Sequence, residues 1–535
     1  MEIDRSPSRI KGLPGWIATV IADWRVLLCL ILLAAAALRV DGIHEPLTDR
    51  FSWRESSTAM MADNFELRNP NILFPEVSWS GPGLSYQGRE FQVVSWTTAQ
   101  LYRVFGWHDW FGRLVAASFG ILGIFSLHQL IARVWDEPHA LAGAMMMAIL
   151  PGAILIDRSF LPDPAMLGLV LAGSWMFVAW LQTDRMWRLA AAVLLLTLGV
   201  LAKSPGAAVV APLGYAAAVI LRRSGGVWRR KLLLLGAAAV AVIVPVVAYY
   251  RWAAYLGRTY PPYHMAGHGF AWDSLVGFVQ HDFYAHEALH HATWLLTLPV
   301  ILLAGVGLLA RPPQGPSGAR WFFHAWLAGA GVIFLLAAEE LTNNPWNFLI
   351  FLPPAAVFAG AALLAIGRMG QPVTSLAGWA RGAVVVLVVL WGWFSHTGQM
   401  RQPVHQNAYA LGMKLKALSG PSDLVITAPT EAGNPVSIYY SRHRGWLHPA
   451  GGGSRDWTLF IDDPKAIAEV RALRAHGARW FGATKDARDR EGHLLTEHNP
   501  QLIAYLDQTA RRVVDDPVMT IWRLSPPVGQ GVAPH

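Results

Sequence analysis

The chain has 535 residues, of which 54% are hydrophobic and only 15% are charged, and its mean hydropathy is +0.34. Soluble domains of this size do not have that composition, so the sequence indicates a polytopic membrane protein. Its single cysteine, Cys29, lies in an apolar run, which excludes disulfide frameworks and cysteine metal sites. The net charge of +8 comes from Lys and Arg residues that fall largely in short loops between apolar runs, where they orient helices. We therefore exclude nucleic acid as a partner.

The first apolar run covers residues 24–40 and is long enough to cross a hydrocarbon core of about 30 Å at about 1.5 Å per helical residue. Basic residues precede it and no small-residue cleavage site follows, which favours a retained anchor over a cleaved signal peptide. Further runs follow at 112–134, 139–156, 164–181, 188–202, 206–221, 231–250, 292–310, 321–338, 347–366 and 382–396. The sequence thus predicts about eleven transmembrane helices.

The distribution of basic residues predicts the orientation of these helices. The arginine-rich loop 222–231 is the strongest cytoplasmic signal, and it places the N-terminus in the cytoplasm. An odd number of spans then places the C-terminus outside. The same side receives a large first loop, 41–111, in which we expect two interfacial helices at 55–67 and 91–105. We expect a multi-pass protein of a bacterial-type inner (plasma) membrane.

The composition turns polar after about residue 400. We predict a transmembrane catalytic domain over 1–398 and a small extracytoplasmic α/β domain over 399–535. The predicted strands are 423–429, 436–443, 478–484 and 518–524, and the predicted helix is 463–477.

Asp49 follows the first span by a few residues, which would place it near the extracytoplasmic interface. A general base that acts on a lipid-linked substrate needs such a position. An acid in a merely solvated loop would look the same.

The turn between two later spans contains Asp157, Arg158 and Asp163, and charges at this depth are costly unless they are paired or hydrated. In the structural interpretation, Asp157 and Arg158 neutralise each other and Asp163 caps the following helix. A capping aspartate can still be catalytic.

Lys203 follows directly on an apolar run, so its ammonium must reach the same surface as Asp49 and Asp163. A cation on the side opposite to the positive loops suggests a bound anion, such as a phosphate at headgroup depth. The alternative is a structural ion pair with a carboxylate of the first loop.

Two weaker signals concern metal and sugar. Glu90, together with His268 in the histidine-rich loop 251–291, could bind zinc or another divalent ion, although no motif such as HExxH is present. Trp346 and Asn347 stand at the start of a span that two prolines should kink. Indole and amide groups suit a sugar, but tryptophan is also the usual interface anchor.

Taken together, these stretches resemble the polyprenyl-phosphate-dependent glycosyltransferases of the C-type membrane fold, which include protein mannosyltransferases and the bacterial aminoarabinose transferases of lipid A. In and just after the first loop the matching residues are Asp49, Trp53, Arg54, Thr58, Ala59, Ala62, Asn64, Phe65, Glu90, Tyr102, Phe105, Gly106, Gly112 and Arg113. In later turns they are Arg158, Pro162, Asp163, Ala202, Lys203, Pro205, Asn347, Leu352, Pro353 and Pro354. Their order, spacing and common side make the combination more specific than any single match.

Two positions depart from the family pattern. Arg50 follows Asp49 where the family often has a second acid, and Phe91 follows Glu90 where aminoarabinose transferases commonly have lysine. The second departure argues against an aminoarabinose donor.

The resemblance implies an inverting glycosyltransferase that moves a monosaccharide from a polyprenyl-phosphate donor to a hydroxyl of an acceptor lipid, glycan or protein. Asp49 would be the general base, and Asp163 would orient the acceptor or share that role. Lys203, with Arg54 or Arg158, would bind the donor phosphate.

The remaining residues would contact substrate. These are Glu90, Trp346 and Asn347, and Glu90 with His268 could also hold a divalent metal ion.

The competing function is a polytopic transporter or lipid flippase, which would also have many spans and charges within the membrane. Transporters usually place such charges near the bilayer midplane, on broken helices in two related halves. Here the charges lie at one predicted interface and no two-half symmetry is visible. The sequence therefore favours the glycosyltransferase.

Overall fold

The computed structural model describes residues 23–87, 89–223, 228–260, 289–336, 344–368, 403–450 and 458–525, with parts of 379–394. The chain divides into two compact units, each assembled from separate stretches. The helical unit contains Met1–Ile43, Arg113–Val247 and Phe270–Gly398. The α/β unit contains His44–Gly112, Ala248–Gly269 and Gln399–His535, so the first loop shares a unit with the C-terminal region. The expected domain boundary after residue 398 stays a prediction.

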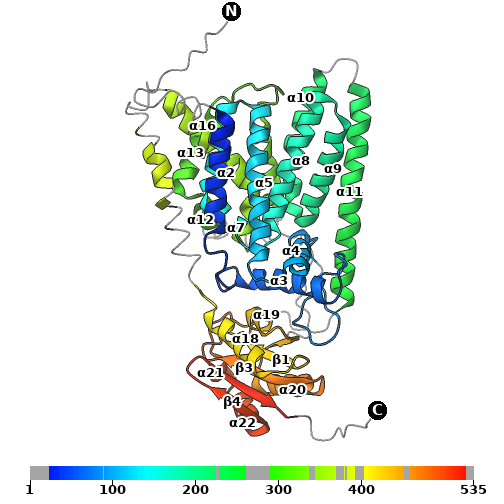
Figure 1. The fold of residues 1–535 in the computed structure, drawn as a ribbon, viewed down its shortest axis with the longest axis vertical. Helices are drawn as coiled ribbons and strands as arrows, with labels where there is room; N and C mark the ends of the chain where they lie inside the picture. Colours follow the sequence, from blue (N-terminus) through cyan, green and yellow to red (C-terminus); the bar gives the residue numbers. More distant parts are fainter. Residues whose placement is uncertain are drawn as a thin grey trace, which may run out of the picture. The chain divides into compact units, whose positions relative to one another are not determined.

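The helical unit is built almost entirely of helices (Figure 1). Wholly or mainly within it lie α2 (Trp24–Val40), α5 (Phe111–Val134), α6 (Glu137–Ile149), α7 (Pro151–Asp157), α8 (Asp163–Thr183), α9 (Met186–Ala202), η1 (Ser204–Val209), α10 (Val210–Arg222), α11 (Trp228–Thr259), α12 (Leu289–Leu296), α13 (Leu298–Leu309), α14 (Phe322–Leu336), η5 (Pro345–Phe351) and α16 (Leu352–Arg368). Every predicted apolar run up to residue 366 coincides with one of these helices or with two consecutive ones. The last run, 382–396, lies only partly within the described residues.

Five of the described helices are long and apolar enough to cross a membrane, or six if the bent pair α6 and α7 is one span. The expected number of about eleven is therefore not confirmed. Helix α8 is the most buried of the five, with 89% of its most apolar window buried, whereas the corresponding window of α11 is only 6% buried. An apolar surface as exposed as that of α11 is stable in lipid and not in water, so the chain is a multi-pass membrane protein.

A break separates α6 from α7, and the two axes differ by 63°. Pro151 begins α7, and proline cannot donate the hydrogen bond that would continue α6. The carbonyl groups at the end of α6 need other partners. Arg39 of α2 supplies them, since its guanidinium donates to the carbonyls of Met147 and Ala148 at 3.4 and 3.1 Å.

Arg39 is fully buried and also forms an ion pair with Asp157, with 2.9 Å between Nε and Oδ2. The expected neutralisation of Asp157 by Arg158 is therefore wrong, because the partner of Asp157 comes from α2. Helix α5 passes so close to this carboxylate that a Cβ at Gly120 would lie 2.4 Å from Asp157 Cγ. The pair thus fixes the turn that leads into α8.

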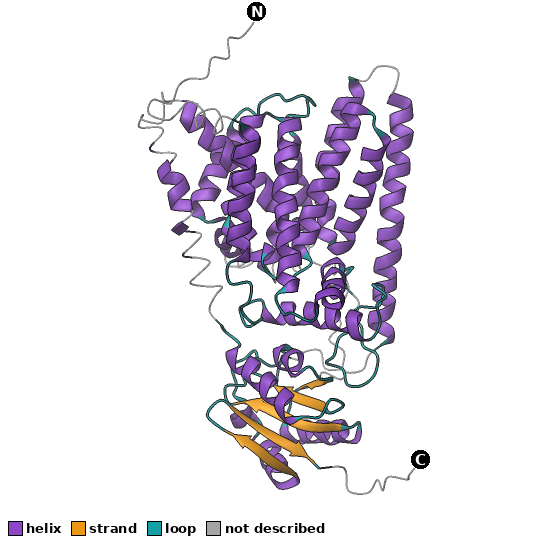
Figure 2. Cartoon of the chain, viewed as in Figure 1, coloured by secondary structure: helices purple, strands orange, loops and turns teal. Residues whose placement is uncertain are grey.

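The α/β unit contains two first-loop helices and a C-terminal sheet (Figure 2). Its elements are α3 (Ser52–Leu67), α4 (Val93–Phe105), α18 (Gln406–Leu418), β1 (Leu424–Ala428), α19 (Val436–Ser441), β2 (Gly445–Leu447), α20 (Asp463–Ala475), β3 (Ala478–Thr484), α21 (Leu495–His498), α22 (Pro500–Thr509), β4 (Ala510–Asp515) and β5 (Met519–Leu524). The strand order is β2-β1-β3-β5-β4, in which β2, β1 and β3 are parallel and β5 is antiparallel to β3 and β4. Trp446, Ile426, Phe481 and Trp522 face one another in register across four strands and are at most 2% exposed, so they form the centre of the core.

The two helices expected in the first loop are present as α3 and α4, and the strands at 423–429, 478–484 and 518–524 and the helix at 463–477 are confirmed. The strand expected at 436–443 is wrong, because α19 occupies that stretch. Its N-terminus is closed by Asn434, whose Oδ1 accepts the Val436 N–H at 3.0 Å. All six residues of α19 are buried, and a helix buried on every side has no apolar period that distinguishes it from a strand.

Candidate functional site

The predicted site residues fall into two groups, one in each unit. The helical unit contains Arg158, Asp163, Lys203, Trp346 and Asn347. The α/β unit contains Asp49, Arg54 and Glu90. His268 lies outside the described residues.

Lys203 is the centre of the group in the helical unit. Its Nζ donates to Asp163 Oδ1 at 2.7 Å and to Asn347 Oδ1 at 2.6 Å, and the lysine is only 8% exposed. Three residues from three separate turns of the sequence are thus in direct contact. The expected partner of Lys203 in the structural interpretation, a carboxylate of the first loop, is wrong, because the carboxylate is that of Asp163.

The local backbone explains how these side chains meet. Lys203 has an extended conformation between α9 and η1, where Pro205 begins the next helix. Asp163 is the first residue of α8, and Pro162 at the N-cap position makes no side-chain cap hydrogen bond. Asp163 is therefore not the N-cap residue that we expected, and its carboxylate pairs with the lysine. Asn347 lies in η5, a single short stretch that also carries Trp346.

Asp163, Asn347 and Trp346 surround the Lys203 ammonium and fix its position. A lysine ammonium has three donors, of which Asp163 and Asn347 accept two. Trp346 adds an aromatic face, with 6.0 Å between Lys203 Nζ and the ring centroid. The arrangement fixes a positive charge that can donate to an anionic oxygen.

Arg158 follows α7 and is 5% exposed. Its Nη2 donates to the carbonyl of Gly42, just beyond α2, at 3.3 Å. Arg158 thus joins the turn before α8 to the end of the first helix.

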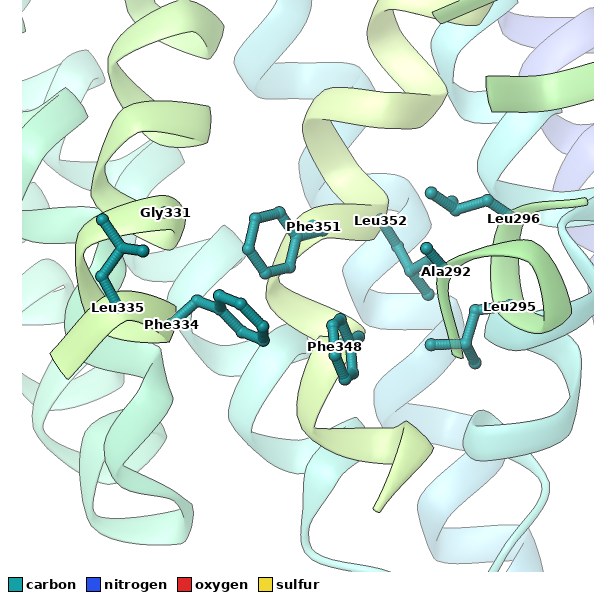
Figure 3. Close-up of a pocket in the computed structure, with 9 residues that line it drawn as sticks. All are labelled: Ala292, Leu295, Leu296, Gly331, Phe334, Leu335, Phe348, Phe351 and Leu352. Atoms are coloured by element: carbon teal, nitrogen blue, oxygen red, sulfur yellow. The ribbon is translucent and has the colours of Figure 1, made fainter. Parts of the chain in front are cut away.

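An apolar cavity of about 360 Å³ lies in the helical unit, between α12, α14 and the junction of η5 with α16 (Figure 3). Phe334, Phe348 and Phe351 and neighbouring leucines line it, and no polar residue does so within the described part of the chain. Because η5 contains both Asn347 and Phe348, one short segment contributes to the lysine cluster and to the cavity. Pocket and cation therefore share an element that orients both.

Asp49 lies at the entrance to α3 in the α/β unit and is half-buried. Its Oδ1 accepts the Phe51 N–H at 2.8 Å and its carbonyl accepts the Ser52 N–H at 3.0 Å. This is a turn in which an aspartate side chain starts a helix, and it fixes one carboxylate oxygen.

Arg54 and Glu90 form an ion pair at 2.5 Å, and each side chain is at most 13% exposed. The Glu90 carbonyl also accepts the hydroxyl of Tyr249 at 2.8 Å. Among the residues that the structure describes, no group of three or more His, Cys, Asp or Glu could hold a metal ion. The divalent metal at Glu90 and His268 stays a prediction.

Several buried polar residues were missed by sequence reasoning, in particular Arg39 and the pair Asp63 and Arg442. Asp63 of α3 accepts from Arg442 at 2.5 Å and from the indole of Trp107 at 3.0 Å. Burial raises the pKa of Asp63 to about 6, although the charge of Arg442 opposes this shift. No local signal marks this pair, since its members are 379 residues apart.

The helical unit thus carries a buried lysine cluster within a multi-pass membrane protein. A profile of the family described as dolichyl-phosphate-mannose-protein mannosyltransferase matches residues 92–250. The match includes Asp163 and Lys203 but not Asp49 or Asn347.

Solved structures of similar fold span most of the chain. ArnT from Cupriavidus metallidurans in the apo state has 14% identity and a TM-score of 0.56, over 93% of this chain and 97% of that one. The Archaeoglobus fulgidus oligosaccharyltransferase has 16% identity and a TM-score of 0.52, over 86% of this chain and 70% of that one. No curated protein sequence matches the chain. The resemblance to polyprenyl-phosphate-dependent glycosyltransferases is confirmed, and the chain has their C-type membrane fold.

Proposed function

We propose that this protein is an inverting glycosyltransferase that moves a monosaccharide from a polyprenyl-phosphate donor to a hydroxyl of a lipid, glycan or protein on the extracytoplasmic side. The observation that carries the proposal is the buried Lys203, held by Asp163 and Asn347 in a chain of this fold. A fixed ammonium can stabilise the charge that develops on a leaving lipid phosphate, and it does so best where water is partly excluded.

The similar structures support a lipid-phosphate donor. ArnT from Cupriavidus metallidurans has been solved bound to undecaprenyl phosphate, with 14% identity and a TM-score of 0.55, over 95% of this chain and 98% of that one. The archaeal oligosaccharyltransferase AglB has been solved with an inhibitory peptide and a dolichol-phosphate, with 14% identity and a TM-score of 0.52, over 86% of this chain and 70% of that one. A donor of the same class in this protein would place its phosphate at Lys203 and its first isoprene units in the apolar cavity beside η5.

In the proposed reaction, Asp49 accepts the proton of the acceptor hydroxyl while that oxygen attacks the anomeric carbon. The bond between this carbon and the phosphate oxygen breaks, and the lipid phosphate leaves. One displacement inverts the anomeric centre. Arg54 and Arg158 are further candidates for the phosphate, and Glu90 and Trp346 for the sugar, while Asp163 holds Lys203 and orients the acceptor.

The proposed orientation has a cytoplasmic N-terminus and an extracytoplasmic C-terminal domain, in a bacterial-type inner membrane. The basic loop 222–231 supports it.

The first test is mass spectrometry of membrane glycolipids and surface glycans from cells with and without the gene, complemented by variants. The wild-type protein should restore one sugar-bearing product and Lys203→Ala should not. Lys231→Ala is the matched control. Lys231 is as buried as Lys203 and its Nζ donates to the Leu181 carbonyl at 3.0 Å. It ends the stretch 222–231, which is predicted to face the cytoplasm and not the proposed site. Restoration by Lys203→Ala would refute the assignment of the site.

A further inference from the structure

We propose that the C-terminal region positions the general base, and that the hydroxyl of Tyr440 is the group that does so. This inference rests on the proposed function, in which Asp49 is the base. It concerns contacts within the α/β unit only.

The peptide groups immediately before Asp49 are held by residues of the C-terminal region. The N–H of Leu47 donates to the hydroxyl oxygen of Tyr440 at 2.6 Å. The backbone N–H of His405 donates to the carbonyl of Thr48 at 3.0 Å. Leu47 and Thr48 are 0% and 3% exposed, so these bonds are shielded from competing water. The backbone conformation that leads into Asp49 therefore depends on two residues far along the chain.

The Tyr440 hydroxyl also joins the two ends of the first loop. It donates to Asp109 Oδ2 at 2.6 Å while it accepts from Leu47. Tyr439 donates to the other oxygen of the same carboxylate at 2.8 Å. A hydroxyl has one donor, so the bond to Asp109 orients its lone pairs toward the Leu47 N–H.

A second set of contacts ties α3, which follows Asp49 directly, to the end of α19. Asp63 of α3 pairs with Arg442 at 2.5 Å. The guanidinium of Arg442 also lies 4.5 Å from the ring centroid of Trp107, whose indole donates to Asp63. These three side chains fix the direction in which α3 leaves the Asp49 turn.

A third set pairs the first loop with the edge of the sheet. Gly81 donates to the carbonyl of Gly445 at 2.7 Å, and Gly445 donates to the carbonyl of Ser78 at 3.0 Å. The indole of Trp446 covers Gly81 so closely that a Cβ there would lie 2.4 Å from the ring, and Gly81 has a φ of +79°. The loop is thus attached beside β2 at a position that only glycine fits.

These contacts matter for catalysis because they fix the position of Asp49, and a general base must lie within hydrogen-bond distance of the acceptor hydroxyl. A misplacement of about 1 Å can cost on the order of 10²-fold in rate. A Tyr-to-Phe change keeps the ring and its packing, so the fold loses only the bonds made by one hydroxyl. Removing the Tyr440 hydroxyl should therefore reduce the rate of transfer far more than it reduces folding.

The test compares three Tyr-to-Phe variants of the full-length protein. Tyr440→Phe removes the bonds to Leu47 and Asp109, whereas Tyr439→Phe removes, among contacts of the described residues, only the bond to Asp109. Tyr409→Phe is the control, since its ring packs on Tyr440 with centroids 4.6 Å apart but its hydroxyl is outside this network.

The kinetic readout is kcat for sugar transfer and KM for the donor. We expect Tyr440→Phe to lower kcat by about tenfold or more, with KM within about twofold. Tyr439→Phe should show a smaller loss and Tyr409→Phe none. The structural readout is hydrogen exchange of the Leu47 amide, which should become faster in Tyr440→Phe alone.

Two outcomes overturn this inference: unchanged kcat and exchange in Tyr440→Phe, or equal losses in Tyr440→Phe and Tyr409→Phe. If Tyr440→Phe fails to fold, Asp109→Leu removes both acceptor oxygens of this carboxylate, and it must show a loss of kcat and faster Leu47 exchange. Full activity of Asp49→Asn would instead refute the proposed base, and the exchange of Leu47 would still report on the contact itself.

Discussion

Lys203 and Asp163 form a buried ion pair with 2.7 Å between Nζ and Oδ1, although 40 residues separate them. The side chains are 11% and 1% exposed. A pair of this kind is a poor source of stability, because the cost of removing both charges from water roughly offsets their attraction. Its presence at the end of two apolar helices is better explained by the need for a fixed cation.

The first prediction separates stability from activity at this pair. Lys203→Met removes the cation that pairs with the buried Asp163, which should destabilise the fold by about 3–5 kcal/mol. The double variant Lys203→Met with Asp163→Leu should recover most of the lost thermal stability, measured as the unfolding temperature in detergent. Neither variant should transfer sugar. Transfer by the double variant would show that the cation is structural only.

The second prediction concerns the break between α6 and α7. Gly120→Ala would place a methyl group 2.4 Å from Asp157 Cγ, against the carboxylate that Arg39 holds. We expect the unfolding temperature to fall, by a free energy of about 1–3 kcal/mol. Gly214→Ala is the control, because no described atom outside its own helix lies within 4 Å of a Cβ there. Equal unfolding temperatures for the two variants would contradict the packing described here.

The third prediction is a pH dependence of folding in the α/β unit. The pKa of Asp63 is raised by burial from 3.8 to about 6. Because the folded protein then binds more protons than the unfolded chain between these values, the contribution of Asp63 to stability is greatest at low pH and declines as pH rises from about 4 to about 6. Asp63→Asn should remove this dependence.

The measurement is the difference in unfolding temperature between wild type and Asp63→Asn across that range. As pH rises, the unfolding temperature of the wild type should fall relative to that of Asp63→Asn. Asp462→Asn is the control for a lost charge, since Asp462 is 71% exposed. A difference independent of pH would show that Asp63 titrates normally.

The fourth prediction concerns Asp49. Asparagine retains an oxygen that can accept the Phe51 N–H, so Asp49→Asn should fold normally. It lacks a basic carboxylate, and kcat should fall by on the order of 10²–10⁴-fold. Asp41→Asn, at an exposed position just after α2, should keep normal kcat. A wild-type rate in Asp49→Asn would assign the base elsewhere.

Much of the fold could be predicted from the sequence because the membrane imposes a length on apolar helices. The sequence also predicts that three polar side chains at the ends of such helices belong to a site: Asp163, Lys203 and Asn347. Burying a charged or amide group at this depth costs free energy unless the group has a partner or a ligand. Their direct contact could not be predicted, because it depends on how the helices pack. The predicted pairing of Asp157 with Arg158 was wrong for the same reason, because the true partner, Arg39, lies 118 residues earlier in the sequence.

The α/β unit shows a second limit of sequence patterns. The apolar run at α19 fits a strand and a fully buried helix equally well, so only tertiary packing decides between them. The attachment of the first loop to the C-terminal region left no local signal, since Leu47 and Tyr440 are 393 residues apart. The change of composition near residue 400 predicts where a polar region begins. It does not predict which residues that region contacts.

Sugar transfer by the purified protein in proteoliposomes is the most direct measurement of the central claim. The assay supplies labelled polyprenyl-phosphate sugars and candidate acceptors, and follows both the product and the movement of free solute or lipid. We predict transfer with inversion of the anomeric centre by the wild-type protein, its loss in Asp49→Asn and Lys203→Met, and its retention in Lys231→Ala. Movement of a solute or lipid across the bilayer without any sugar transfer would contradict the account and identify a transporter or flippase instead.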